Sequence, residues 1–322
     1  MTSNAKKNRI IFEPTDEVIS RAAEIIKNGG LVAFPTETVY GLGANALDET
    51  AIRKIFEAKG RPADNPLILH VAGIREASLY AVMNRTAERL MEHFWPGPLT
   101  IVLYSLNSVP LSARGGLDTV ALRSPMNHIA LNLIKKSGTP IAAPSANVSG
   151  RPSPTTVEAV WDDLGDGVDM IIDGGRTAIG VESTVADATG ENIFILRPGG
   201  VTREMLKAVA DVADDGSALT RRSPGTRHRH YAPSVEVRLW EREGLEIFQN
   251  ISGWCYVGVR TPPDGYIKKI TFDTPENYAR GLFSALRELE SCGASVIIAD
   301  VPDNAGLGEA IRNRLSHAAG NI

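Results

Sequence analysis

Cysteine is scarce in this sequence, because only Cys255 and Cys292 occur among 322 residues. These two are much farther apart than the C-x-x-C spacing of many zinc ligands and redox pairs. We therefore expect neither a disulfide framework nor a cysteine-based zinc site. Free cysteines are typical of proteins in a reducing compartment, so we expect a cytoplasmic protein.

Long apolar runs are also missing. The first nine residues are polar, without the apolar region of a signal peptide, and no stretch resembles a membrane span. We therefore expect no membrane partner. The formal net charge of −4 argues against avid, sequence-independent binding of nucleic acid, although a local basic patch stays compatible with it.

Several common catalytic signatures are absent. The chain has no G-x-x-x-x-G-K-[ST] phosphate loop, no H-E-x-x-H zinc motif and no G-x-S-x-G nucleophile elbow. Paired-histidine spacing is absent too, so we predict no metal site built from the protein's own ligands. These absences favour phosphoryl or nucleotidyl transfer, in which a protein mainly positions groups and neutralises charge.

Hydrophobic periodicity divides the chain into two α/β parts. Residues 9–212 alternate short apolar strands with amphipathic helices, which predicts one large α/β domain. Residues 213–233 lack this periodicity and carry several arginines and histidines, so we predict a linker. Residues 234–322 predict a small domain of strand–helix repeats, including a helix over 275–290 capped by Thr274. That part has no G-x-G-x-x-G, and we predict no dinucleotide there.

The most polar segment of the first part follows an apolar strand at residues 31–34. Thr36, Thr38 and Tyr40 form a hydroxyl-rich run bounded by glycine, which predicts a binding loop. A helix then ends at residues 59–62, where Lys59 and Arg61 would face these hydroxyls. Two cations beside a hydroxyl loop suit a polyanion.

Cations favour the ends of helices in any protein, so Lys59 and Arg61 alone also fit a solvated helix end. Arg123, Arg151 and Arg197, however, stand at strand or loop ends beside small residues as well. Convergent cations repel one another unless an anion binds among them, and the arginine fork fits phosphate or carboxylate. The pattern favours an anion site.

A second small-residue loop follows a predicted strand at residues 140–143. It contains Ser145, Asn147, Ser149, Gly150 and Ser153. Short hydroxyls and open backbone N–H groups can cradle phosphate without bulk. An Asx or serine turn explains the local pattern equally well.

Two further polar positions are ambiguous. His70 lies in a predicted strand over residues 67–71, where a lone histidine is usually a core residue, and the local pattern favours that interpretation. Ser183 lies in a Glu-Ser-Thr run that fits either strand-edge packing or a hydroxyl contact, and spacing does not decide between them.

Three separated segments resemble the threonylcarbamoyl-AMP synthase family: FPTETVYGLG at residues 34–43, KGRP at 59–62 and SAN at 145–147. The mark of this family is the pair K-x-R and S-x-N, and no motif position departs from it. The resemblance extends over about residues 29–200. SPG at 223–225 and HYAP at 230–233 resemble the linker of the long, two-domain form.

The resemblance implies a twisted, mixed-sheet α/β domain with a concave positive face, a linker over the active site and a smaller Rossmann-like α/β domain. It implies an L-threonylcarbamoyladenylate synthase, which converts L-threonine, bicarbonate and ATP, with Mg²⁺, into L-threonylcarbamoyl-AMP and pyrophosphate. The product would supply the threonylcarbamoyl group for adenosine 37 of tRNAs that read A-starting codons. A tRNA threonylcarbamoyl transferase complex is the implied downstream partner.

The same likeness assigns residues to roles. The implied L-threonine site consists of Thr38, His70, Arg123, the backbone at Ala143, and Ser183. The implied ATP site consists of Arg61, Asn65, Thr119, Ser145, Ser153, Arg197 and Tyr231. The implied catalytic motif consists of Lys59, Arg61, Ser145 and Asn147, of which Lys59 and Asn147 would contact phosphates or their metal.

Other interpretations stay open. The linker, with Tyr231, is either a lid over the nucleotide or a solvated tether. A module that binds duplex RNA or tRNA on the basic face is compatible with the pattern, as is weak tRNA binding by an enzyme. Carbamoyl-adenylate chemistry of hydrogenase maturation uses a related domain, but the accompanying acylphosphatase and zinc modules are missing. The C-terminal domain fits a ligand sensor or a docking surface equally well.

Overall fold

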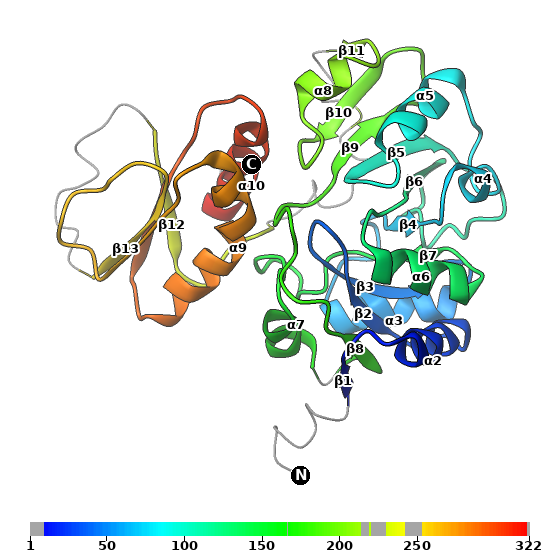
Figure 1. The fold of residues 1–322 in the computed structure, drawn as a ribbon, viewed down its shortest axis with the longest axis horizontal. Coiled ribbons are helices and arrows are strands. Elements are labelled where there is room, and N and C mark those ends of the chain that lie inside the picture. The colour runs from blue at the N-terminus through cyan, green and yellow to red at the C-terminus, as the bar shows by residue number, and fades with distance from the viewer. Residues whose placement is uncertain (1–9, 166, 214–218, 220–229, 242–252, 321–322) are drawn as a thin grey trace.

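The structure is a computed structural model that describes residues 10–165, 167–213, 219, 230–241 and 253–320. Figure 1 shows a large mixed sheet with its helices and, beside it, a small sheet with two helices. The predicted α/β class is confirmed. The linker predicted at 213–233 falls largely outside the described residues, and the boundaries of the two predicted domains stay predictions.

Among the described residues, eleven strands form the large sheet, in the order β1-β8-β2-β3-β7-β4-β6-β5-β9-β10-β11. Parallel and antiparallel pairs are mixed along it, as in the β2–β8 and β2–β3 pairs. The strands are β1 (Ile11–Phe12), β2 (Val32–Pro35), β3 (Tyr40–Asn45), β4 (Ile68–His70), β5 (Leu99–Tyr104), β6 (Thr119–Arg123), β7 (Ile141–Ala142), β8 (Met170–Ile172), β9 (Thr184–Asp187), β10 (Ile193–Arg197) and β11 (Val212–Ala213).

Helices cover both faces of the first half of this sheet. They are α2 (Asp16–Lys27), α3 (Glu49–Lys59), α4 (Ile74–Ala77), α5 (Arg85–Phe94), α6 (His128–Ser137), α7 (Val157–Leu164) and α8 (Arg203–Lys207). Side chains alternate along a strand, so Val32 and Phe34 pack with α2 and α6, whereas Ala33 packs in the cluster that contains α3, α5 and α7. None of the described helices is long and apolar enough to cross a bilayer.

The second half of the large sheet has a face that these helices leave open. On β4 and β6, Leu69 and Leu122 belong to the main core with α3 and α5. Ile68 and Ala121 point to the other side, into a small apolar cluster that contains no residue from α2 to α8. Arg123 follows two residues after Ala121 and therefore lies on the same open face.

The binding loop predicted from residue 36 onward is shorter than expected. It is a turn that ends at Val39, because residues 40–45 form the buried strand β3, antiparallel to β2. A Cβ atom at Gly43 would lie 2.7 Å from the Phe34 ring and 2.8 Å from Ile141. Glycine at this position gives the aromatic ring room in the core, rather than marking a loop.

The small sheet has four parallel strands in the order β12 (Glu236–Trp240), β15 (Val296–Asp300), β13 (Trp254–Gly258) and β14 (Lys268–Thr271). Its helices are α9 (Pro275–Ser291) and α10 (Leu307–Ala319). The Thr274 hydroxyl accepts a hydrogen bond from the Asn277 amide at 3.2 Å and caps α9 where the sequence predicted it. A parallel sheet with helices is the arrangement expected of a Rossmann-like part.

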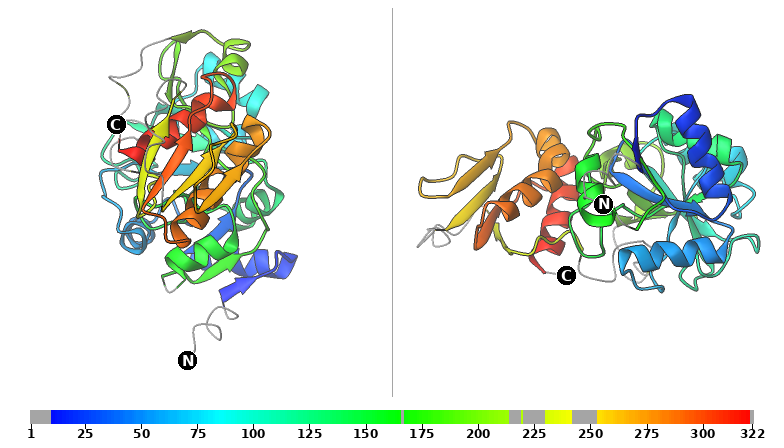
Figure 2. Two further views of the ribbon diagram at one scale, coloured as in Figure 1. Left: turned by 90° about the vertical axis from the view of Figure 1, so that its left-hand side faces the viewer. Right: turned by 90° about the horizontal axis from the view of Figure 1, so that it is seen from below.

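Helices α9 and α10 face the large sheet's part of the molecule, with the small sheet behind them (Figures 1 and 2). Arg287 of α9 forms a bidentate ion pair with the Asp163 carboxylate, at 2.7 and 3.1 Å. The Asp163 side chain is fully buried. The Thr155 and Ser284 hydroxyls lie 2.8 Å apart across the same junction. Buried polar contacts therefore fix one part against the other.

The Arg287–Asp163 pair predicts a large stability effect. Replacing Arg287 with methionine would leave the Asp163 carboxylate buried without its main partner, so we expect the free energy of unfolding to fall by about 3 kcal/mol. Urea denaturation measures this change. As a control, Lys269→Ala breaks an exposed pair with Asp264 and should cost less than about 1 kcal/mol. Equal losses in the two variants would contradict the prediction.

Candidate functional site

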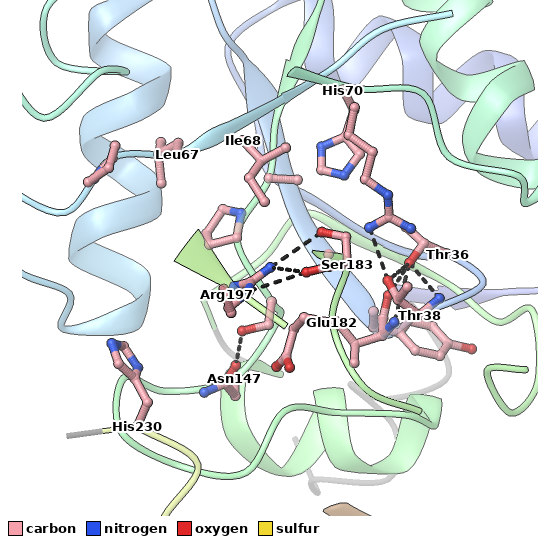
Figure 3. A pocket seen from close by; sticks show the side chains of 18 of the residues that line it. Thr36, Thr38, Leu67, Ile68, His70, Asn147, Glu182, Ser183, Arg197 and His230 are labelled. Atoms are coloured by element: carbon pink, nitrogen blue, oxygen red, sulfur yellow. Dashed lines mark hydrogen bonds between the residues drawn. The ribbon is translucent and has the colours of Figure 1, made fainter. Parts of the chain in front are cut away.

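A pocket lies on the open face of the large sheet (Figure 3), and its lining residue Tyr231 packs against helices α9 and α10 of the C-terminal part. Its walls come from strands β3, β4, β6 and β10, from the loops that follow β7 and α3, and from residues 230–231. Its lining residues are Thr36, Thr38, Val39, Tyr40, Gly41, Arg61, Pro66, Leu67, Ile68, His70, Arg123, Ala143, Pro144, Ser145, Asn147, Glu182, Ser183, Arg197, His230 and Tyr231.

Three arginines line this pocket. Arg123 and Arg197 are buried in its wall, and Arg61 follows Gly60, whose left-handed backbone (φ 58°) ends α3. Burial, with repulsion from Arg197, lowers the pKa of Arg61 to about 10. Burial also lowers the pKa of Arg197. An anion in the pocket would relieve this repulsion, as the sequence pattern predicted.

Arg123 is held in a fixed orientation. It donates from Nη2 to the Glu37 carboxylate at 2.7 Å, from Nη1 to the Thr38 hydroxyl at 3.0 Å and from Nε to the Gly97 carbonyl at 3.3 Å. Both Arg123 and Glu37 are almost fully buried. The guanidinium group is thus positioned in advance for a ligand and need not be ordered on binding.

Lys59 supports the pocket from behind. Its ammonium group donates to the Ser145 carbonyl at 2.5 Å and to the Asn147 carbonyl, and it is not among the lining residues. Lys59 is only 2% exposed, so the interpretation as a solvated helix end is wrong for this residue. Burial lowers the pKa of Lys59 well below its ordinary value. The K-x-R and S-x-N segments are therefore joined physically.

The loop after β7 is shaped by its own side chains as well. The Ser145 hydroxyl donates to Asn147 Oδ1 at 2.5 Å, and Asn147 Nδ2 donates to the Arg151 carbonyl at 2.9 Å. The turn that the sequence allowed is therefore present. Ser145 and Asn147 nevertheless line the pocket, so the turn and the site coincide.

His70 lies in β4 and is both a core residue and a lining residue. Its ring contacts Phe34 edge to face, with 6.2 Å between ring centroids, and it is 3% exposed. Burial, followed by the nearby Arg123 charge, lowers the pKa of His70 to about 3. The imidazole is therefore neutral at physiological pH.

Tyr231 closes one side of the pocket. It has a left-handed backbone, with φ of 64°, which is uncommon for a residue other than glycine. Its ring stacks on Phe283 of α9 at 5.4 Å and meets His317 of α10 edge to face. Helices of the C-terminal part therefore hold this residue against the site. The preceding residues 220–229, where the lid interpretation mainly falls, lie outside the described residues.

Comparisons with known proteins identify the family of this chain. Residues 24–199 match the family model of Sua5, YciO and YrdC proteins, described as "Telomere recombination". Residues 201–320 match a model described as "Threonylcarbamoyl-AMP synthase, C-terminal domain". The chain belongs to the Sua5/YciO/YrdC family.

Two curated relatives of this family are similar over almost their whole length. Threonylcarbamoyl-AMP synthase of Pyrococcus abyssi is 47% identical, over 93% of each chain. The protein of the same name from Bacillus subtilis is 42% identical, over 98% of each chain. The crystal structure of P. abyssi Sua5 complexed with L-threonine superposes with a TM-score of 0.89, at 44% identity, over 97% of this chain and 96% of that one.

The pocket of this Sua5/YciO/YrdC member brings together most of the residues that sequence analysis selected. The lining includes Thr38, His70, Arg123, Ala143 and Ser183 from the implied threonine site, and Arg61, Ser145, Asn147, Arg197 and Tyr231 from the implied ATP site and motif. Four selected residues are not among the lining: Lys59, Asn65, Thr119 and Ser153. The individual roles of all these residues stay predictions.

Of those four, Lys59 lies behind the loop, and Ser153 donates its hydroxyl to Glu182 at 2.5 Å. Thr119 begins β6, at the opposite end from Arg123. Asn65 is fully buried in the segment after Arg61. Arg151 lies at the junction, 3.0 Å from the Glu290 carboxylate, and is not a lining residue.

Sequence analysis missed three groups that shape the site. Glu37 orients Arg123, and Glu182 is the only carboxylate among the lining residues. Arg314, in α10, forms an ion pair with Glu182 at 2.6 Å. No local pattern reveals their roles, although Glu37 lies in the FPTETVYGLG segment and Glu182 in the Glu-Ser-Thr run, because each acts through a partner more than 80 positions away in the sequence.

A metal ion would find few ligands from this chain. Among the described residues, no group of three histidine, cysteine, aspartate or glutamate side chains could hold one. The lining carboxylate, Glu182, is already paired with Arg314. Mg²⁺ commonly binds through substrate phosphates and waters, so the residues present fit Mg²⁺ as part of an MgATP substrate.

The neutral His70 predicts a pH dependence of stability. The unfolded chain binds a proton at His70 below its ordinary pKa of 6.5, whereas the folded chain does so only near 3, so stability is lost as pH falls through this window. At about pH 5.5 the loss from this residue is about 1.4 kcal/mol relative to neutral pH.

Replacing His70 with asparagine removes this contribution. We expect the stability difference between about pH 7.5 and pH 5.5, measured by urea denaturation, to shrink by about 1.4 kcal/mol. His128→Asn, at an exposed position, is the matched control. The same difference in wild type and His70→Asn would show that His70 is not the group concerned.

Proposed function

We propose that this chain is an L-threonylcarbamoyladenylate synthase, which converts L-threonine, bicarbonate and MgATP into L-threonylcarbamoyl-AMP and pyrophosphate. The observation that carries the proposal is a pocket with two polar ends. Arg61, Arg197 and the loop that carries Ser145 lie at one end of the pocket. Arg123, Thr38 and His70 lie at the other end. The names of the Pyrococcus and Bacillus relatives, and the L-threonine bound to P. abyssi Sua5, support the same assignment.

Arg123 is suited to the carboxylate of the amino acid. A guanidinium group pairs with a carboxylate bidentately, and Glu37 and Thr38 already fix its plane. The Thr38 hydroxyl and the neutral His70 ring provide hydrogen-bonding groups for the threonine hydroxyl. A site that pairs a substrate hydroxyl rejects analogues that lack it, because its own polar groups would be left unpaired.

The other end of the pocket is suited to the triphosphate. Arg61 and Arg197 would offset negative charge that develops on the phosphates as the bond to pyrophosphate breaks. The Ser145 hydroxyl and the Asn147 amide provide short polar contacts without bulk. Lys59 fixes the loop that carries both, so its contribution is the position of that loop.

The chemistry needs positioning more than it needs a covalent intermediate. The threonine amine and bicarbonate give a carbamate and release water, and a carbamate oxygen then attacks the α-phosphorus while pyrophosphate leaves. A carbamate is a weak nucleophile that decomposes easily in water, so in-line alignment inside a shielded pocket favours the reaction. The buried arginines and the cover of Tyr231 supply that setting.

The product would supply a tRNA threonylcarbamoyl transferase complex, which modifies adenosine 37 of tRNAs that read A-starting codons. The proposal includes a cytoplasmic location for the enzyme. A mixed acid anhydride hydrolyses readily, so transfer would follow synthesis without long storage. Weak binding of tRNA to the chain itself is compatible with the proposal and is not needed for the reaction.

The decisive experiment incubates the protein with MgATP, L-threonine and labelled bicarbonate. We expect a labelled, short-lived adenylate and pyrophosphate, formed only when all three substrates are present. Omission of threonine or bicarbonate is the control. RNA binding with a steep salt dependence, without any ATP consumption, would instead support an RNA-binding module and overturn the proposal.

Arg123 predicts a selective effect on the amino acid. Arg123→Lys keeps the charge but loses the bidentate fork, so we expect the KM for L-threonine to rise by at least about tenfold, with the KM for ATP changing by less than about threefold. Initial rates of pyrophosphate release measure both. Arg75→Lys, at an exposed position, is the control. A larger change for ATP than for threonine would contradict the assignment.

A further inference from the structure

A buried ion pair joins the C-terminal part to the pocket. Arg314 of α10 donates from Nε to the Glu182 carboxylate at 2.6 Å, and Glu182 lines the pocket. Arg314 is completely buried, and it is the largest fully buried side chain among the described residues. The guanidinium group also donates from Nη1 to the Pro198 carbonyl at 3.0 Å, in the loop after β10. Arg314 thus contacts the lining residue Glu182 and the residue that follows the lining residue Arg197.

Glu182 also contacts Ser153, which is not itself a lining residue. The second oxygen of Glu182 accepts a hydrogen bond from the Ser153 hydroxyl at 2.5 Å. The Arg314 guanidinium also lies 5.2 Å from the centroid of the Tyr231 ring. Arg314 therefore contacts Tyr231 directly and Ser153 through Glu182. The family likeness assigns both residues to the ATP site.

The charge arrangement explains why such a contact matters. Glu182 is the only carboxylate among residues that line a pocket with three arginines, and its charge would repel a triphosphate. Burial opposes its ionisation, but Arg314 and then Arg197 outweigh burial and lower the pKa of Glu182. The carboxylate therefore stays ionised, and the ion pair with Arg314 offsets its charge.

We propose that Arg314 is a positioning residue of the nucleotide site, which acts through Glu182 on Ser153 and by direct contact on Tyr231; this inference rests on the proposed function. The C-terminal part is then a component of the site rather than only a sensor or docking surface. Its helix α10 supplies the cation that forms the ion pair with Glu182, the carboxylate among the lining residues.

The test is nucleotide binding, measured by isothermal titration calorimetry with Mg²⁺ and a non-hydrolysable ATP analogue. Arg314→Met leaves the buried Glu182 without its ion-pair partner, so we expect the Kd for the analogue to rise by at least about tenfold. The Kd for L-threonine should change by less than about threefold, because Arg314 does not contact Arg123 or Thr38. A merely structural defect would weaken both ligands together.

The double variant Arg314→Met with Glu182→Gln provides a rescue. It removes the unpaired charge while a side-chain oxygen can still accept from Ser153, so we expect the Kd for the analogue to return to within about threefold of wild type. Glu309→Gln is the matched control, because Glu309 of the same helix pairs with Arg203 at 2.9 Å and is not a lining residue. It should leave both Kd values within about threefold.

Unchanged binding of the analogue in a folded Arg314→Met protein would overturn the inference, as would equal weakening of both ligands without rescue. Should that variant not fold, Arg314→Lys carries the test. Arg314→Lys keeps the positive charge, but a lysine side chain cannot make both the contact with Glu182 and the contact with Pro198. Wild-type affinity for the analogue in this variant would also overturn the inference. Failure of the wild type to form the labelled adenylate would overturn the proposed function alone, because the binding comparison does not depend on turnover.

Discussion

Three arginines share one pocket, two of them buried and the third half-buried, and the groups around the pocket compensate their charges. Arg123 and Arg197 are buried on a sheet face that helices α2 to α8 leave open, and Arg61 reaches the same pocket from the loop after α3. Buried charge is costly unless it is paired, and Glu37 and Glu182 supply only part of the compensation. The remaining positive potential is what a triphosphate and an amino-acid carboxylate would satisfy.

The supporting groups are buried as deeply as the groups that would touch a ligand. Glu37 fixes Arg123, Lys59 fixes the loop with Ser145, and Arg314 fixes Glu182. Each contact replaces solvation that the charged group lost on folding. A site built in this way is ordered before substrate arrives, so little binding energy is consumed in arranging it.

The C-terminal part contacts the pocket through its two helices. Its helices α9 and α10 carry Phe283, which stacks on Tyr231, and Arg314, which reaches Glu182. The Arg287–Asp163 pair joins the same helices to the first part at a second place. Because the Arg314–Glu182 ion pair is buried, movement of one part against the other would separate two charges at the pocket itself.

Local patterns predicted much of the fold. The cap at Thr274, the end of α3 at Gly60 and the strand with His70 follow from neighbours within a few positions, and the structure confirms them. The strand β3 was missed, since Gly43 resembles a loop residue until Phe34 is packed against it. For His70, the sequence could not decide between a core residue and a binding residue, because the side chain is both. It packs against Phe34 and also lines the pocket.

The sequence by itself determined the class of fold and, through the K-x-R and S-x-N segments, which residues to expect in one pocket. Only the tertiary structure decided that Lys59 supports the loop from behind and that Arg314 belongs to the site. The physical reason is that local propensity and spacing act over a few residues, whereas the pairing of buried charges depends on which surfaces meet. Glu182 and Arg314 are 132 positions apart in the sequence. Only the packing of α10 against the first part of the chain brings them to within 2.6 Å of each other.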